Sequence, residues 1–201
     1  MDEAGNADTF PKLLLHHVAV RAQRPAMREK RFGIWTTWTW EALAREVQAL
    51  TLGLRASGVT AGQRVAVIGV NRSRLYWSIT AVQCLGAIPV PLYPDSVADE
   101  MSYLLAHAGV VAAIVEDQEQ VDKVLSVLAE LPALRLVVYD DPRGMVDYDS
   151  GDRSLMSLEA VLARGQEASS AEGLGSAFVD LVARTDGAAT SIILYTSGTT
   201  G

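Results

Sequence analysis

Residues 195–201, with the sequence YTSGTTG, place glycines and hydroxyl side chains directly after the apolar run SIILY (residues 191–195). Glycine permits positive φ and lets a backbone approach a ligand with no Cβ in the way. Consecutive backbone N–H groups can then converge on one anion, while the hydroxyls donate to phosphate oxygens or order a hydrated Mg²⁺ ion. The loop is therefore a candidate phosphate site. The candidate binding residues are Thr196, Ser197, Gly198, Thr199, Thr200 and Gly201.

Other glycine-containing motifs fit this string less well. A Walker A loop has four residues between its glycines and ends in Gly-Lys-Ser/Thr, whereas two residues separate Gly198 from Gly201 and no lysine is present. A nucleophile elbow needs glycine two residues before the serine, where Tyr195 stands. On composition alone, a polar turn after a strand and a phosphate loop explain the string equally well.

Composition limits the class of protein. A chain of 201 residues with 49% hydrophobic side chains can bury the core of one α/β domain. Its net charge of -7 argues against a nucleic-acid partner, because no basic surface neutralises phosphates. Cys84 is the only cysteine, so no internal disulfide can form and a reducing compartment is the simpler interpretation. The acidic amino terminus and the absence of a long apolar stretch predict a cytoplasmic chain without a transmembrane segment.

The elements that must position the loop follow from periodicity and turn residues. Residues 26–40 predict a two-stranded hairpin, and Thr39 is expected to cap a helix that ends at Gly58. Short apolar runs at residues 64–68, 87–93, 110–115, 135–139 and 191–195 then alternate with helical stretches. Pro89 and Pro91 cannot donate to a ladder, so the second of these runs is expected to be a sheet-edge or an irregular strand.

This alternation predicts an α/β fold with a mostly parallel sheet and helices on both faces. Ligands of such sheets bind at the carboxyl ends of the strands. The sequence therefore predicts that SIILY is a buried strand and that YTSGTTG lies at its carboxyl end.

Other conspicuous residues have structural interpretations. The tryptophans of the hairpin are expected to pack on a neighbouring helix rather than line a ligand site. The aspartates of residues 140–153 do not have the spacing of an EF-hand and predict a solvated loop that begins near Asp140. Asn71 is expected to cap a helix and Cys84 to fill the core. No functional role is expected for His16, His17 or His107, which lack acidic or cysteine partners at ligand spacing.

YTSGTTG resembles the phosphate-binding loop of the adenylate-forming (AMP-binding) enzymes, which include acyl-CoA synthetases, nonribosomal-peptide adenylation domains and luciferases. Upstream, TWTWEALAREVQALTLGLRASGV with RVAVIGVNRSRLYW resembles the opening helix and strand of these enzymes. EDQEQVDKV and VVYDDPRG are similar to long-chain fatty-acid CoA ligases in particular. In the family the loop continues to Pro-Lys-Gly, which is not present here.

The resemblance implies a two-step ligase whose substrates are ATP, a fatty acid and coenzyme A. A carboxylate attacks the α-phosphate of ATP to give acyl-adenylate and pyrophosphate, and the thiol of coenzyme A then displaces AMP. By this analogy residues 196–201 hold the β and γ phosphates, and Mg²⁺ bridges phosphate oxygens. The resemblance assigns no catalytic residue and no protein ligand of the metal, and peripheral membrane contact is compatible with it.

Residues 1–201 are expected to be the amino-terminal portion of an AMP-binding domain, incomplete at the carboxyl end and inactive alone. Two alternatives stay open. One is an adenylating enzyme for a medium-chain, aryl or amino acid, and the other is a non-catalytic nucleotide-binding half-domain.

Overall fold

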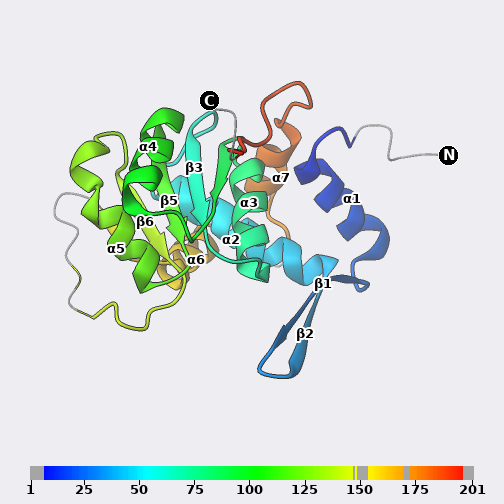
Figure 1. Ribbon diagram of the computed structural model, residues 1–201. Coiled ribbons are helices and arrows are strands. Elements are labelled where there is room, and N and C mark those ends of the chain that lie inside the picture. Colours follow the sequence, from blue (N-terminus) through cyan, green and yellow to red (C-terminus); the bar gives the residue numbers. More distant parts are fainter. Residues whose placement is uncertain (1–6, 147, 149–153, 170–172, 197–201) are drawn as a thin grey trace.

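The computed structural model describes residues 7–146, 148, 154–169 and 173–196 (Figure 1). The strands are β1 (Pro25–Arg31), β2 (Ile34–Thr39), β3 (Arg64–Ile68), β4 (Ile88–Leu92), β5 (Val110–Val115), β6 (Leu136–Tyr139) and β7 (Ser154–Ser157). The helices are α1 (Phe10–Arg21), α2 (Trp40–Ala56), α3 (Ser73–Cys84), α4 (Ala98–Ala108), α5 (Gln118–Ser126), α6 (Leu158–Ala168) and α7 (Ser176–Ala183), with a 3₁₀ turn at Leu128–Glu130.

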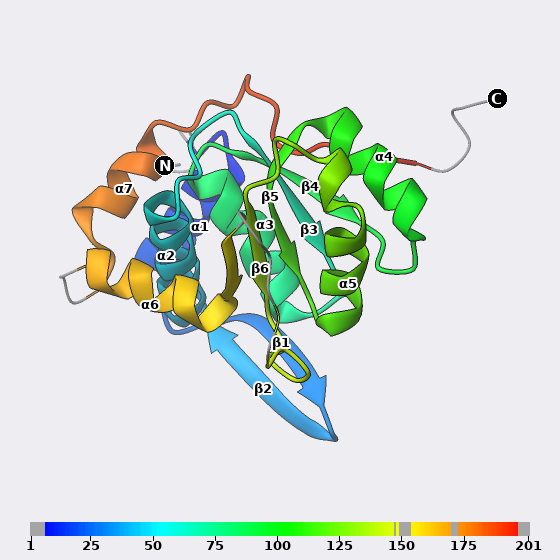
Figure 2. The same cartoon turned by 90° about the vertical axis from the view of Figure 1, so that its left-hand side faces the viewer.

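The main sheet has the strand order β4-β3-β5-β6-β7, and all its pairs are parallel. One core fills the space between this sheet and α1, α2, α3, α6 and α7, with Leu50 and Phe178 among its fully buried side chains. A second core, which includes Met101 and Leu105, lies under α4 and α5 on the other face. The predicted parallel sheet with helices on both faces is confirmed (Figures 1 and 2).

Helix α2 has the N-cap and the terminating glycine that the sequence predicts. The Thr39 hydroxyl accepts a hydrogen bond from the backbone N–H of Ala42 at 3.2 Å, as expected of an N-cap. Gly58, at φ +91, follows the helix where an L side chain would be strained. Along its length α2 packs against α6, and the two backbones approach closely at Gly53 and Gly165. No helix in the part of the chain that the structure describes is both long and apolar enough to cross a bilayer.

Strands β1 and β2 form a separate antiparallel hairpin that projects from the lower end of the molecule in both views (Figures 1 and 2). Trp38 packs edge-on against Trp77 of α3, with ring centroids 5.4 Å apart. The ring centroids of Trp40 and His17 of α1 are 4.2 Å apart. The prediction that the tryptophans pack on helices is confirmed for these two and is wrong for Trp35, which is 56% exposed.

Two helix starts and one strand differ from the sequence prediction. Asn71 does not cap α3, because Arg72 has the extended backbone of the N-cap position and makes no side-chain capping bond. From the sequence, Asp95 or Ser96 is the expected start of the helix that ends at Gly109, but α4 begins at Ala98, after Val97. Strand β7 was not predicted, since its sequence SLMS is short and only half apolar.

Candidate functional site

Of the candidate binding residues only Thr196 is described, and residues 197–201 lie outside the described residues. Three contacts position the segment that leads to Thr196. Both the carbonyl oxygen and the hydroxyl of Ser191 accept hydrogen bonds from Gln83 Nε2, at 3.0 and 2.9 Å. The Ile193 N–H donates to the carbonyl of Pro89 at 3.0 Å. The Tyr195 hydroxyl and His107 Nδ1 are 2.7 Å apart.

These contacts correct the predicted position of Tyr195 and Thr196. Gln83 lies at the end of α3, Pro89 near the start of β4, and His107 in the last turn of α4, just before β5. All three therefore mark the amino ends of the sheet strands. Tyr195 and Thr196 lie at the end of the sheet opposite to the one predicted, as the red segment at the top of Figures 1 and 2 shows.

The prediction that SIILY is a buried strand is also wrong for the described residues. Residues 191–196 form no strand, and Leu194 is 65% exposed. Ile193 and Tyr195 pack against the second core. The physical reason lies in β4, the edge strand, because Pro89 and Pro91 have no N–H and the outer edge can only accept hydrogen bonds at these positions. A regular ladder needs donors on both chains, so only the single bond from Ile193 forms.

His107 has a role that the sequence did not predict. Its ring contacts Tyr195 edge-on with centroids 5.8 Å apart, and the hydrogen bond joins the same pair. Burial is the main cause that raises the pKa of Tyr195, so the phenol stays neutral and holds this contact at physiological pH. The pair anchors the residue directly before the predicted loop to α4.

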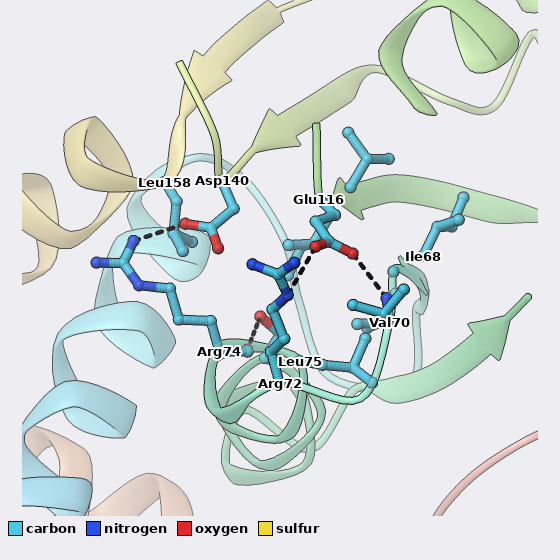
Figure 3. A pocket seen from close by; sticks show the side chains of 13 residues that line it. Ile68, Val70, Arg72, Arg74, Leu75, Glu116, Asp140 and Leu158 are labelled. Atoms are coloured by element: carbon cyan, nitrogen blue, oxygen red, sulfur yellow. Dashed lines mark hydrogen bonds and ion pairs between the residues drawn. The ribbon is translucent and has the colours of Figure 1, made fainter. Parts of the chain in front are cut away.

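The carboxyl ends of the strands hold a second candidate site. The connection after β3 leads to α3 on one face, and the connection after β5 leads to α5 on the other. Such a switch point leaves a crevice between the two strand ends. A pocket lies there, lined by residues of β3, β5, the start of α3 and the residues that follow each strand (Figure 3).

Paired charges line this pocket. Glu116 follows β5 and accepts from the Val70 N–H at 2.7 Å, while Arg72 pairs with it at 3.0 Å (Figure 3). Arg74 pairs with Asp140 after β6 at 2.6 Å and with Glu159 of α6 at 2.8 Å.

Burial raises the pKa of Asp140, and the nearby Arg74 only partly offsets this effect. Arg72 and Arg74 are thus already paired with carboxylates, and an anion could bind the arginines only by displacing these carboxylates. These ion pairs and hydrogen bonds have a structural role, since they connect the ends of β3, β5 and β6 to α3 and α6. Sequence reasoning missed it. The available signal was that Glu116 and Asp140 are the first polar residues after apolar runs.

No group of three or more His, Cys, Asp or Glu side chains within the described ranges could hold a metal ion. The Asp-rich loop is described only at residues 140–146 and 148, so its other aspartates lie outside the described residues.

Comparison with known proteins gives a consistent family. Residues 14–201 match the family described as AMP-binding enzyme. Long-chain-fatty-acid–CoA ligase FadD15 of Mycobacterium tuberculosis is 32% identical over 108 residues, which are 53% of this chain and 18% of that protein. Feruloyl-CoA synthase of an Amycolatopsis species is 33% identical over 110 residues, 53% of this chain and 22% of the relative.

Solved structures agree in fold at lower identity. The adenylation domain of a carboxylate reductase from Mycobacterium chelonae superposes with a TM-score of 0.68 at 16% identity, covering 86% of this chain and 30% of that one. An anthranilate CoA ligase in complex with anthranoyl-AMP gives a TM-score of 0.57 at 23% identity, covering 64% and 24%. The chain thus spans less than a third of the length of these relatives. With a match over residues 14–201, the chain belongs to the AMP-binding enzyme family.

Proposed function

We propose that this chain supplies the phosphate-binding part of an ATP-dependent acid–CoA ligase that acts on long-chain fatty acids. The observation that carries the proposal is the YTSGTTG string within a chain that matches the AMP-binding family over residues 14–201. The match to FadD15 supports the fatty-acid class. We further propose that residues 1–201 form the amino-terminal portion of the AMP-binding domain.

In the proposed reaction an acid carboxylate attacks the α-phosphate of ATP, forming acyl-adenylate and releasing pyrophosphate. The thiol of coenzyme A then attacks the acyl carbon and AMP leaves. Residues 196–201 would donate backbone N–H and hydroxyl hydrogen bonds to the β and γ phosphates. Donors placed where charge develops stabilise the transition state more than the ground state.

Mg²⁺ is expected with ATP, where it would neutralise phosphate charge. The residues that the structure describes do not offer a cluster of metal-binding side chains. We therefore assign no protein ligand to the ion.

The Tyr195–His107 contact has a defined part in this proposal. A phosphate loop must be held in position by the residues that precede it, because flexible donors lose the advantage of preorganisation. Tyr195 is bonded to α4 and packed on the second core immediately before Thr196. We propose that this anchor fixes the direction in which the loop leaves the domain.

The test is acid-dependent exchange of labelled pyrophosphate into ATP, using protein expressed from the complete coding region. We expect exchange with palmitate, and a fall of about 100-fold, equivalent to about 3 kcal/mol at the transition state, when Thr196, Ser197 or Thr199 is replaced by alanine. Thr60→Ala is the matched control, since Thr60 is exposed in the turn before β3. Wild-type exchange in all three loop variants would mean that the loop is only a turn.

A second candidate function is a ligase for aromatic acids, favoured by the 33% identity to feruloyl-CoA synthase. The same assay with ferulate, octanoate, palmitate and an amino acid separates these classes. Exchange with ferulate and none with palmitate would replace the fatty-acid proposal. Nucleotide binding without exchange for any acid would favour a non-catalytic module.

A further inference from the structure

The end of the β1–β2 hairpin carries large apolar side chains that the described residues leave exposed. Within residues 28–35, called here the hairpin tip, Phe32 is 89% exposed, Ile34 71% and Trp35 56%. Single exposed apolar residues are common on protein surfaces, but a contiguous group of large ones marks an interaction site. Figures 1 and 2 both show the hairpin reaching away from the sheet and helices.

Three cations surround these side chains. The Arg28 guanidinium lies 4.9 Å from the centre of the Trp35 ring and the Lys30 ammonium 5.9 Å from it. The Arg31 guanidinium lies 5.3 Å from the Phe32 ring. None of the three forms an ion pair with a described carboxylate.

Glu29, the one carboxylate among residues 28–35, offsets only one of these three charges. Its carboxylate accepts the backbone N–H of Ser73 at 3.0 Å, at the start of α3. Hydrogen bonding to Ser73 is the main cause that lowers the pKa of Glu29, so this carboxylate stays charged and turned toward the body of the protein. The tip is therefore locally cationic in a chain whose net charge is -7.

The turn itself is conformationally unfavourable for its sequence. Phe32 has φ +49 and Gly33 has φ +82, and the flanking Arg31 and Ile34 are paired. Positive φ at both central residues is the pattern of a type I′ turn, for which Asn-Gly is preferred. Phe32 is the one non-glycine residue at positive φ among those described. Because its side chain is almost fully exposed, folding gains little from phenylalanine there, and an external contact would account for it.

The shape and charge favour one kind of partner. Aromatic side chains settle at the boundary between lipid headgroups and hydrocarbon, and neighbouring lysines and arginines attract anionic headgroups. Beyond the contact of Glu29 with Ser73, the hairpin continues for two paired residues and the turn, about 7 Å at about 3.3 Å per residue, which is close to the Debye length of about 8 Å at physiological salt. Because the hairpin projects from the body in both views, its cationic end can touch an anionic surface before the acidic body does. A nucleic acid would also attract the cations of the tip, but its phosphate backbone would leave the apolar side chains of the tip without an apolar partner.

We propose that the hairpin tip is an interfacial anchor that inserts Phe32, Ile34 and Trp35 into the headgroup region of an anionic lipid bilayer. Arg28, Lys30 and Arg31 bind the surrounding lipid phosphates and carboxylates. The proposal does not depend on the acid that the enzyme activates. It concerns where the protein is located, and its test measures binding rather than catalysis.

Flotation of the 201-residue chain with vesicles tests the proposal. We expect binding to phosphatidylcholine vesicles containing 30% phosphatidylserine, and much weaker binding to phosphatidylcholine alone. Replacing Arg28, Lys30 and Arg31 together by glutamine should weaken partitioning about 100-fold, from about fivefold per cation. Phe32→Ser with Trp35→Ser should reduce it at least tenfold.

The matched control is Tyr93→Ser with Val97→Ser, an exposed apolar pair after β4 that should leave vesicle binding unchanged. Phe32→Asn supplies a second test, because asparagine suits the turn. This variant should unfold at the same or a higher urea concentration and yet bind vesicles more weakly. Quenching of tryptophan fluorescence by brominated lipids should also fall in Trp35→Phe, which retains an aromatic anchor but loses the exposed indole.

Two results overturn the proposal. One is the absence of binding by the unmodified chain to anionic vesicles, or equal binding by the unmodified chain and the tip variants. The other is concentration-dependent dimerisation without vesicle binding, lost in the same variants, which would assign the tip to a contact between copies of the chain.

Discussion

The close approach of α2 and α6 makes Gly165→Ala an informative substitution. A Cβ at position 165 would lie 1.7 Å from the carbonyl oxygen of Ala49 and 2.8 Å from the backbone nitrogen of Gly53. Real Cβ atoms essentially never come within 3.0 Å of such atoms. Because both obstacles are backbone, no rotation of a side chain relieves the clash, and the helices must separate by roughly 1 Å. A gap of that size forfeits about a quarter to a half of the dispersion energy of the contacts that it opens.

Two opposing effects set the size of the change. Alanine is favoured over glycine in a helix interior by about 1 kcal/mol. Overpacking typically costs about 1–3 kcal/mol, and a clash with backbone belongs at the upper end. We therefore expect Gly165→Ala to lower the free energy of unfolding by about 2 kcal/mol. For a chain of this size that corresponds to a Tm lower by about 4–8 °C.

Urea denaturation followed by far-UV circular dichroism measures this change. Ala163→Gly is the matched control, since Ala163 is exposed on the same helix and should lose only the propensity difference of about 1 kcal/mol. If Gly165→Ala instead raised stability by about 1 kcal/mol, helix propensity alone would explain it. The close packing of α2 on α6 would then be refuted.

Buried or charged groups give three further predictions. Cys84 is buried, and burial raises the pKa of its thiol. A thiol reagent should therefore label Cys84 no faster than the chain unfolds, and rapid labelling of the native protein would contradict this. Burial, with smaller effects of the Arg21 and His16 charges, lowers the pKa of His17, so the unfolded state binds this proton more readily. Stability should fall as the pH decreases below about 7 toward 5.5, and less so in His17→Phe, as urea titrations at the two pH values can measure. Arg74→Met leaves Asp140 without its partner and should lower the free energy of unfolding by about 1–2 kcal/mol. Arg74→Lys should lower it less. Equal urea midpoints for wild type and Arg74→Met would contradict a stabilising role of the Arg74–Asp140 pair.

The sequence predicted the family of the candidate site but not its position in the fold. The YTSGTTG string indicated its family, and the match over residues 14–201 agrees with it. The string did not indicate where in the fold the loop lies. The position of its described residues, Tyr195 and Thr196, depends on contacts that residues 191–195 make with Gln83, Pro89 and His107, which come from three elements distant in sequence.

The sequence by itself determined the local structure. The Thr39 cap, the αL glycine at Gly109 and the apolar run of β5 each depend on interactions within a few residues, so their signals lie in adjacent letters. Tertiary structure alone decided the order of the strands and, with it, which strand ends meet.

That order brings Glu116 to Arg72 and Asp140 to Arg74. It also leaves Pro89 on an edge that residues 191–196 cannot extend as a strand. Pairing between distant segments depends on the donors and acceptors that each edge has left unpaired, and these are fixed only when the whole sheet has assembled.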